Sequence, residues 1–266
     1  MVSDIERPSV RDRLAPAGRA WRPLVVGWLV LFAGVTTVGL LLVGPFAGGR
    51  VDRWDLEIAR WFVDHRTSTW NSLAEAGTWL AETATVPAVL LVAVVVAWRV
   101  SDNVAAPVFL VVAVGGEKLI YLFSSLIIGR DRPPVPTVGT SYATSSFPSG
   151  HVASAVTLYG GIALLIALRR SAAVRAALLA IVGVLATVVA LCRMYTGFHY
   201  LTDSIAGVLV GAAWLTIVYR SVLLPSEVAA GAQTPSGHEH APKTAHFGDQ
   251  KAFGSRPDEV NCSATR

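Results

Sequence analysis

Six apolar stretches, each close to the length of a bilayer-spanning helix, constrain the fold of this chain more than any other feature. A span needs about 20 predominantly apolar residues in a helix, because lipid offers the backbone no other hydrogen-bond partner. The stretch at 152–168 is short, and the one at 76–98 is convincing only from Val86 onward, since Glu82 lies near its start. The pattern predicts an all-α, polytopic membrane protein with six transmembrane helices, at residues 24–44, 76–98, 105–129, 152–168, 172–192 and 204–224.

The scarcity of charge supports a membrane protein. Charged residues make up 15% of the 266 positions and apolar residues 53%, whereas a soluble globular protein carries about 25% charged residues. The net charge of +4 is too small and too scattered for a nucleic-acid-binding surface. Two cysteines are too few for a disulfide scaffold. An ordinary cytosolic enzyme and a nucleic-acid-binding protein are therefore excluded.

The arginines of the short loops indicate how the helices cross the membrane, because cytoplasmic loops are enriched in basic residues. Arginine follows the second, fourth and sixth stretches and is frequent before the first. The loop after the first stretch also contains arginines, but acidic residues dilute them. We therefore predict a multi-pass protein of the plasma membrane with both termini cytoplasmic and the loops after the first, third and fifth stretches extracytoplasmic.

Three regions differ in composition. Residues 1–23 are predicted to form a basic cytoplasmic segment, and residues 24–224 form the six-helix membrane domain. Residues 225–266 lack apolar periodicity and are rich in small and polar residues, so they are predicted to be a disordered cytoplasmic tail. The histidines of this tail are interpreted as incidental rather than as metal ligands.

An amphipathic segment lies in the first outer loop, at about residues 50–75. Its apolar residues recur at helical spacing on one face, with charged residues elsewhere around the helix: Trp54, Ile58, Trp61 and Phe62. Two interpretations stay open. The segment either lies in the membrane interface, as tryptophan-rich amphipathic helices do, or packs as a cap on the helix bundle.

Ionisable and polar residues gather at the predicted outer ends of the third to sixth spans. Burying such groups beside lipid is costly, so they are candidates for function. Two of the three histidines that precede the tail belong to this set, whose members are Arg130, Arg132, Ser149, Gly150, His151, Arg193, His199 and Asp203.

Part of this set is suited to hold phosphate. Arg132 and Arg193 offer guanidinium groups, whose fork of N–H donors matches phosphate oxygens. Ser149 and Gly150 precede the fourth span, so their main-chain N–H groups are predicted to point outward from a helix N-terminus, where anions bind. Gly150 also lets an oxyanion approach the main chain closely.

The rest of the set is suited to transfer the phosphoryl group. His199 and Asp203 are spaced i, i+4, so the carboxylate can fix one imidazole tautomer and leave the other nitrogen free to attack. His151 is then available as general acid for the leaving oxygen. We predict phosphoryl transfer through a phosphohistidine, with no cofactor and no metal, since no carboxylate cluster is expected here to hold Mg²⁺ or Zn²⁺.

The residues form three blocks that resemble the signature of the type 2 phosphatidic acid phosphatase (PAP2) superfamily, lipid phosphatases related to the vanadium haloperoxidases. The blocks are Arg132-Pro133, Pro148-Ser149-Gly150-His151, and Arg193 followed by His199 and Asp203. The resemblance spans roughly residues 105–224 and implies a PAP2/vanadium haloperoxidase-like helical core. It also implies His199 as nucleophile, Asp203 as its partner and His151 as acid, with phosphate held by Arg132, Arg193, Ser149 and Gly150. Cys192 departs from the signature, which has serine there.

A second departure is that the family's lysine is missing, since its position is Ser125. Lys118 lies on a similar helical face, but at 1.5 Å per residue it is about 21 Å from Arg132 along the helix axis. We therefore interpret Lys118 as a partner of Glu117 and predict that Arg130 takes the place of the missing lysine at the phosphate.

The resemblance implies a phosphorylated lipid of the bilayer as substrate. The first candidate is a polyprenyl diphosphate, undecaprenyl or decaprenyl, because the site is predicted to be extracytoplasmic. Phosphatidic acid or phosphatidylglycerol phosphate is the second. A protein of another class, which binds or transports phospholipid without catalysis, is the alternative that the missing lysine raises. The sequence indicates no protein partner.

Overall fold

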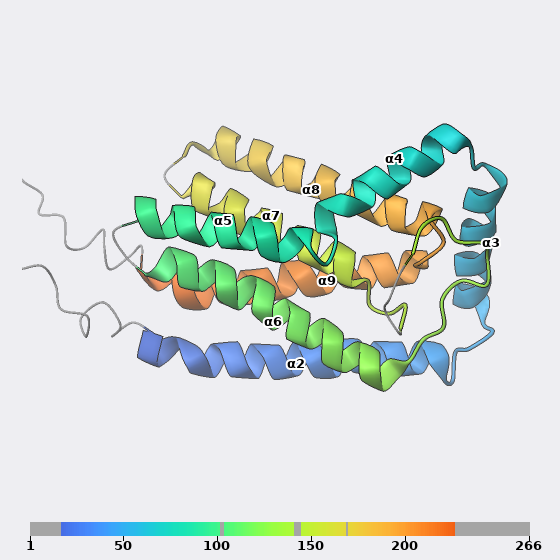
Figure 1. Ribbon diagram of the computed structural model, residues 1–266. Helices are drawn as coiled ribbons and strands as arrows, with labels where there is room; N and C mark the ends of the chain where they lie inside the picture. Colours follow the sequence, from blue (N-terminus) through green and yellow to red (C-terminus); the bar gives the residue numbers. More distant parts are fainter. Residues whose placement is uncertain (1–16, 102–103, 141–144, 169, 227–266) are drawn as a thin grey trace, which may run out of the picture.

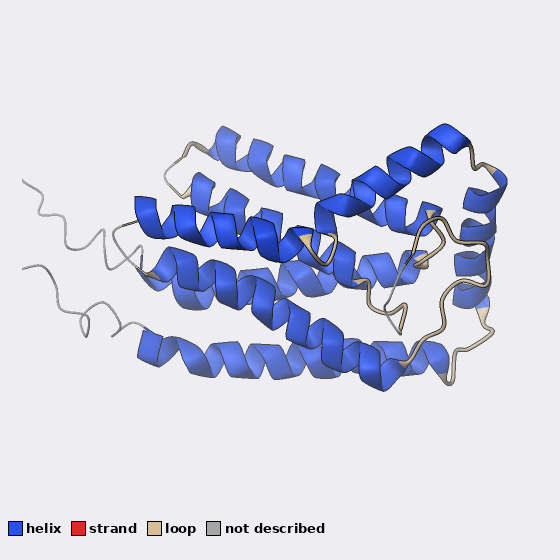
Figure 2. Ribbon diagram, viewed as in Figure 1, coloured by secondary structure: helices blue, strands red, loops and turns tan. Residues whose placement is uncertain are grey.

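The computed structural model describes residues 17–101, 104–140, 145–168 and 170–226. Within these ranges the protein consists of helices and loops and has no strand (Figure 2). Most of the predicted N-terminal segment and almost all of the predicted tail lie outside the described residues. The helices are α2 (Ala17–Val43), α3 (Arg50–Asp64), α4 (Ser68–Thr78), the short 3₁₀ helix η1 (Trp79–Ala81), α5 (Thr85–Val100), α6 (Ala105–Ile128), α7 (Gly150–Ala167), α8 (Ala172–Tyr195) and α9 (Leu201–Val218), which continues into a π-helical turn (Tyr219–Leu223).

Five helices of the described chain are long and apolar enough to cross a membrane, which confirms a multi-pass protein. They are α2, α6, α7, α8 and α9 with its extension. Their outward faces carry large apolar side chains, for example Leu179, Ile181 and Val184 on α8, which are more than half exposed. In water such a surface would aggregate, whereas in a bilayer it meets lipid.

The remaining predicted span, over residues 76–98, is not one continuous helix. The chain there forms two helical pieces, 68–81 and 85–100, which meet at an angle of 44° around Glu82. Pro87 lies in the first turn of α5, where its missing N–H costs no helical hydrogen bond, and a helix running through it would lose one. Together the two pieces are long and apolar enough for a broken span or a re-entrant loop.

The helices run side by side, and α3 crosses one end of the bundle (Figure 1). The beginning of α2 and the end of α9 lie at the opposite end, together with the connection between α7 and α8. α7 contacts α6, α8 and α9 and is the most enclosed of the spans, with 67% of its apolar window buried against 11% for α8. The candidate residues at the start of α7 are therefore surrounded by protein.

The amphipathic segment is α3, and its apolar residues do not all face the same way. Trp54 and Trp61 are 63% and 56% exposed and point away from the bundle. Phe62 packs edge-to-face on Tyr195 of α8, with ring centroids 6.1 Å apart. The residue of α3 buried most deeply is Asp55, at 2% exposure. The helix thus caps the bundle through a polar side while its tryptophans stay free to contact the membrane interface.

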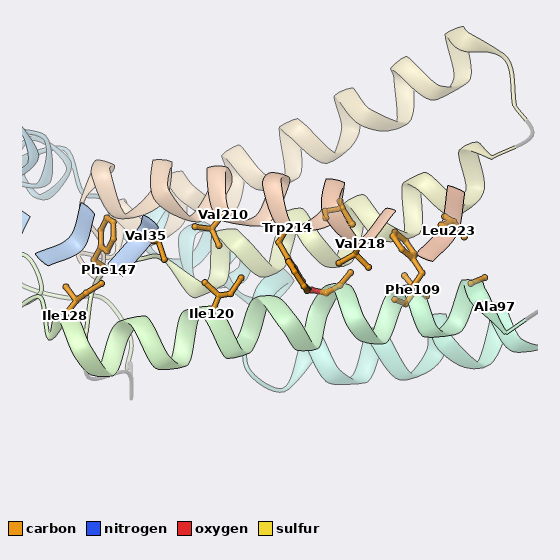
Figure 3. Packing of buried hydrophobic residues seen from close by; sticks show 14 residues of the cluster. Val35, Ala97, Phe109, Ile120, Ile128, Phe147, Val210, Trp214, Val218 and Leu223 are labelled. Carbon is orange, nitrogen blue, oxygen red and sulfur yellow. The ribbon is translucent and has the colours of Figure 1, made fainter. Parts of the chain in front are cut away.

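A cluster of apolar side chains joins α2, α6 and α9 along the length of the bundle (Figure 3). Trp214 of α9 is 2% exposed and lies at its centre. Its indole Nε1 donates to the carbonyl of Ala113 at 2.9 Å, so the one polar atom of the ring is satisfied inside the core. This cluster fixes α6 against α9, the two helices whose ends carry Arg130 and Asp203.

Two glycines bring α9 into backbone contact with α7. A Cβ atom at Gly207 would lie 2.6 Å from the carbonyl oxygen of Ser149, and one at Gly211 would lie 2.9 Å from that of Ala153. Small residues at i, i+4 permit this close approach between membrane helices. One turn before Gly207, the carbonyl of Asp203 accepts a hydrogen bond from the Ser149 N–H at 3.0 Å. The glycine contact therefore aligns the start of α9 with the start of α7.

Substitution of Gly207 by alanine is expected to lower stability by about 1–3 kcal/mol, because an added methyl meets a backbone oxygen that cannot swing aside. The control is Gly183→Ala in α8, where no atom lies within 4 Å of the added Cβ. Thermal unfolding of both purified variants in detergent should show a lower Tm for Gly207→Ala alone. Equal Tm values would contradict the close α7–α9 contact.

Candidate active site

His199 lies in the turn between α8 and α9, and the surrounding backbone fixes its ring. The side chain is 3% exposed. Its Nδ1 is 2.7 Å from the carbonyl oxygen of Ser146 and 3.6 Å from a carboxylate oxygen of Asp203. Both neighbours are acceptors, so the proton belongs on Nδ1 and the lone pair of Nε2 is free. The sequence spacing predicted the Asp203 contact, but it contained no signal for the nearer Ser146 carbonyl.

Asp203 is completely buried at the start of α9 and is held as a carboxylate. It accepts hydrogen bonds from Arg130 Nη1 at 2.6 Å and from the main-chain N–H of Tyr200 at 2.8 Å. The helix N-terminus adds a favourable dipole. These donors stabilise the negative charge that lies beside His199.

Burial and charge act in opposite directions on His199. Burial lowers the pKa of this imidazole below its ordinary value, and the hydrogen-bonded Asp203 carboxylate opposes the shift without cancelling it. His199 is therefore neutral at physiological pH, the state in which an imidazole is a nucleophile.

His151 lies in the first turn of α7 and faces the same space as His199. The two ring centroids are 6.5 Å apart. Nε2 of His151 is 3.5 Å from a carboxylate oxygen of Glu82, which approaches from the break between α4 and α5. Sequence reasoning placed both histidines together, as found, but it used Glu82 only to judge the limits of a span. An acidic residue inside an apolar stretch was the sequence signal that could have pointed to Glu82.

Two guanidinium groups converge around Phe198, next to His199. The Cζ atoms of Arg132 and Arg193 lie 5.3 Å and 4.6 Å from the centre of the Phe198 ring. Arg132 also donates from Nη1 to the Phe198 carbonyl at 3.0 Å. Burial lowers the pKa of Arg132, but arginine stays charged. Like charges held this close favour an anion that both can share.

Ser149 and Gly150 stand at the N-terminus of α7 as predicted, at the end of the helix that faces His199. Ser149 is the N-cap residue and is fully buried. Among the described residues its hydroxyl has no hydrogen-bond partner, although a buried polar group normally has one. The first N–H groups of a helix likewise lack partners within the helix. The Ser149 N–H is not available to an anion as predicted, because it donates to the Asp203 carbonyl at 3.0 Å. The Ser149 hydroxyl and the first N–H groups of α7 are the donors that accompany the two arginines.

Arg130 has other partners than the predicted phosphate. It is 6% exposed, and its guanidinium lies 2.6 Å from Asp203, 3.0 Å from Asp55 and 3.3 Å from Asp52. Burial alone would lower its pKa, but the Asp203 and Asp55 carboxylates outweigh burial and the pKa is raised. The sequence analysis did not place the aspartates of α3 beside the site. The structure favours Arg130 as a positioning residue for Asp203.

Lys118 also departs from its expected place. It does approach Glu117, at 3.9 Å, as predicted. However, its Nζ lies 3.4 Å from the carbonyl oxygen of Gly150, in the first turn of α7. The estimate along the α6 axis had placed it too deep to reach the phosphate site. That estimate ignored where α7 begins, which is beside the middle of α6 rather than at its end.

No group of three or more His, Cys, Asp or Glu side chains is arranged to hold a metal ion in the part of the chain that the structure describes. The carboxylates of Asp203, Asp55 and Asp52 surround Arg130, whose positive charge already occupies the space between them. The residues present are suited to bind an anion beside an imidazole nucleophile.

Comparison with known proteins supports the relation that the motifs indicate. Residues 106–225 match the PAP2 superfamily. The fold is similar to the crystal structure of a transmembrane PAP2-type phosphatidylglycerolphosphate phosphatase from Bacillus subtilis, with a TM-score of 0.62 and 20% sequence identity over 81% of this chain and 98% of the other. Comparison with curated proteins gives no match. The three sequence blocks of the site all fall within residues 106–225, the part of this multi-pass membrane protein that matches the PAP2 superfamily.

Proposed function

We propose that the protein is a metal-independent lipid phosphatase that removes phosphate or pyrophosphate from a membrane lipid through a phosphohistidine on His199. The match of residues 106–225 to the PAP2 superfamily supports a phosphoric ester hydrolase. The observation that carries the proposed mechanism is the buried His199 ring, whose Nδ1 faces two acceptors and whose Nε2 lone pair is free to attack.

The proposed reaction has two steps. Nε2 of His199 attacks phosphorus and forms a P–N bond while the bond to the leaving oxygen breaks, and His151 donates a proton to that oxygen. Water then attacks phosphorus, His151 takes one of its protons, and the P–N bond breaks to release inorganic phosphate and restore both histidines. Charge on the phosphoryl oxygens is stabilised by Arg132 and Arg193 and by the Ser149 hydroxyl.

The substrate is proposed to come from the bilayer at the extracytoplasmic face. Polyprenyl diphosphate and phosphatidylglycerol phosphate are the two lipids to compare first, with phosphatidic acid as the simplest monoester. The similarity to a phosphatidylglycerolphosphate phosphatase concerns the fold, and it keeps that lipid among the candidates. The alternative is a lipid-binding or transport protein, which would bind a phospholipid at the same site without hydrolysing it.

Phosphate release in detergent with EDTA present tests the enzyme and its metal independence together. His199→Ala and His151→Ala are expected to abolish measurable turnover, since a positioned acid or base alone contributes about 10²–10⁴-fold. Asp203→Asn should retain part of the activity, because the Ser146 carbonyl still holds the Nδ1 proton. His65→Ala is the matched control, as this exposed histidine directly after α3 contacts Trp61 of that helix and is not among the candidate site residues. Equal, near-zero release by wild type and His199→Ala would support the non-catalytic alternative.

The pH dependence of kcat/KM follows from the lowered pKa of His199. Protonation of the nucleophile stops attack, so the rate should fall on the acid side only as pH drops through this pKa, below the ordinary histidine value of about 6.5. Asp203→Asn removes the charge that opposes the shift and should move the acid limb to still lower pH. An acid limb above pH about 6.5 in the wild type would contradict a buried neutral nucleophile.

The proposed orientation is tested by reporter fusions on the two sides. Thr137 lies in the loop between α6 and α7, at the end of the bundle capped by α3, and Arg170 lies in the connection at the opposite end. We expect fusions at Thr137 to report an extracytoplasmic position and those at Arg170 a cytoplasmic one. The reverse result would place the site on the cytoplasmic side and remove the argument for an outer-leaflet substrate.

A further inference from the structure

We propose that a pocket beside Glu82 receives the part of the leaving group next to the reacting phosphate and selects a unit that carries hydroxyl groups, such as a glycerol or a sugar, over a second phosphate joined directly to the first. The pocket has a volume of about 380 Å³, within the range of small-molecule sites. The inference rests on the proposed phosphatase function and adds the chemical class of its substrate.

The pocket adjoins the site on the side of the general acid. Arg193 and Phe198 line it and also belong to the cationic group beside His199. Glu82 lines it as well and reaches His151 Nε2 at 3.5 Å. A general acid must face the oxygen to which it gives its proton. The part of the substrate attached to that oxygen therefore extends from His151 past Glu82 and into the pocket.

Apart from Arg193, the charged and hydroxyl side chains that α4, the break after it and the end of α8 contribute to the pocket offer acceptors. Glu75 and Glu82 offer carboxylate oxygens. Thr78 and Thr196 also line the pocket, but their hydroxyl hydrogens are committed to the carbonyls of Ala74 and Cys192, at 2.9 Å and 2.8 Å. Only the oxygen lone pairs of these threonines remain available. A ligand that fits such a lining must bring donors of its own.

A hydroxylated leaving group supplies these donors, and a phosphate does not. Each alcohol O–H can donate to a carboxylate, which gives a short and strong hydrogen bond. An ionised phosphate offers acceptors alone and carries negative charge, so two carboxylates would repel it. The charged donor of the lining, Arg193, is the residue proposed to hold the phosphate that is transferred. In a polyprenyl diphosphate the second phosphate is joined directly to the first and would enter this pocket.

The test compares kcat/KM of the full-length protein in detergent on three lipids. Phosphatidylglycerol phosphate has a free glycerol hydroxyl next to the reacting phosphate, and its phosphodiester lies beyond that glycerol. Phosphatidic acid has no such hydroxyl, and undecaprenyl diphosphate has a second phosphate joined directly to the first. The wild type should prefer phosphatidylglycerol phosphate to the diphosphate by about tenfold or more, the value of one hydrogen bond to a charged group. Thermal unfolding of each variant used below checks that its fold is intact.

Glu75→Ala is the informative substitution, because Glu75 is exposed on α4 and does not touch His151. It should lower the ratio of kcat/KM on phosphatidylglycerol phosphate to that on phosphatidic acid by about tenfold. Glu75→Lys should raise the relative rate on the diphosphate, since it reverses one charge. The matched control is Glu57→Ala, an exposed glutamate of α3 outside the pocket, which should leave the ratios unchanged.

The outcomes separate the two proposals. Phosphate release that favours the diphosphate, or ratios that Glu75→Ala and Glu75→Lys do not change, would overturn the leaving-group pocket and leave the phosphatase standing. Absence of release from every lipid would overturn the proposed function and the pocket with it.

Discussion

The buried guanidinium of Arg130 is the group on which the arrangement of the site depends. Its side chain binds Asp203 of α9 and Asp55 of α3. Its main chain also takes part, since the Arg130 carbonyl accepts a hydrogen bond from the Ser146 N–H at 2.9 Å. Ser146 in turn presents the carbonyl that holds His199. One residue thus sets both acceptors of the imidazole. Without its positive charge, buried carboxylates would face one another unpaired, which is strongly unfavourable.

The contacts of Arg130 also explain why α3 belongs to the site although it lies across the end of the bundle. Asp55 accepts the main-chain N–H of Thr202 at 3.1 Å and the hydroxyl of the same residue. It therefore holds the first turn of α9 as well as Arg130. On its other side α3 exposes Trp54 and Trp61, the residue type that anchors at membrane interfaces. The same helix connects the membrane surface to the residues that orient Asp203.

Apolar length and periodicity were enough to predict the fold in outline. They identified five of the membrane helices to within a few residues and placed the start of α5 near Val86. They failed where the outcome depends on neighbours in space. The bend at Glu82 belongs to a stretch whose hydropathy alone favours a continuous span, and whether α3 lies on lipid or on protein is decided by Asp55, a residue that the apolar pattern ignores.

In the site, too, features set by sequence spacing could be predicted, and features set by neighbours in space could not. Spacing along the chain brought together His151, His199 and Asp203, because each belongs to a helix end or the turn before it. Distance along one helix misplaced Lys118, because the depth at which α7 begins is set by its packing against α6 and α9. The aspartates around Arg130 come from a helix far away in sequence, and no motif spacing can include them.

Two different neighbours of His199 orient its imidazole ring and supply negative charge beside it. A carbonyl at 2.7 Å is a better hydrogen-bond acceptor for Nδ1 than a carboxylate at 3.6 Å, so the Ser146 backbone sets the tautomer. Asp203 has its strongest contact with Arg130, and what it supplies to His199 is negative charge at short range. In the proposed mechanism, that charge matters most when the imidazole becomes positive on bonding to phosphorus. The orienting contact comes from a main-chain atom, which any residue can provide, and this is why the sequence motif contains the aspartate alone.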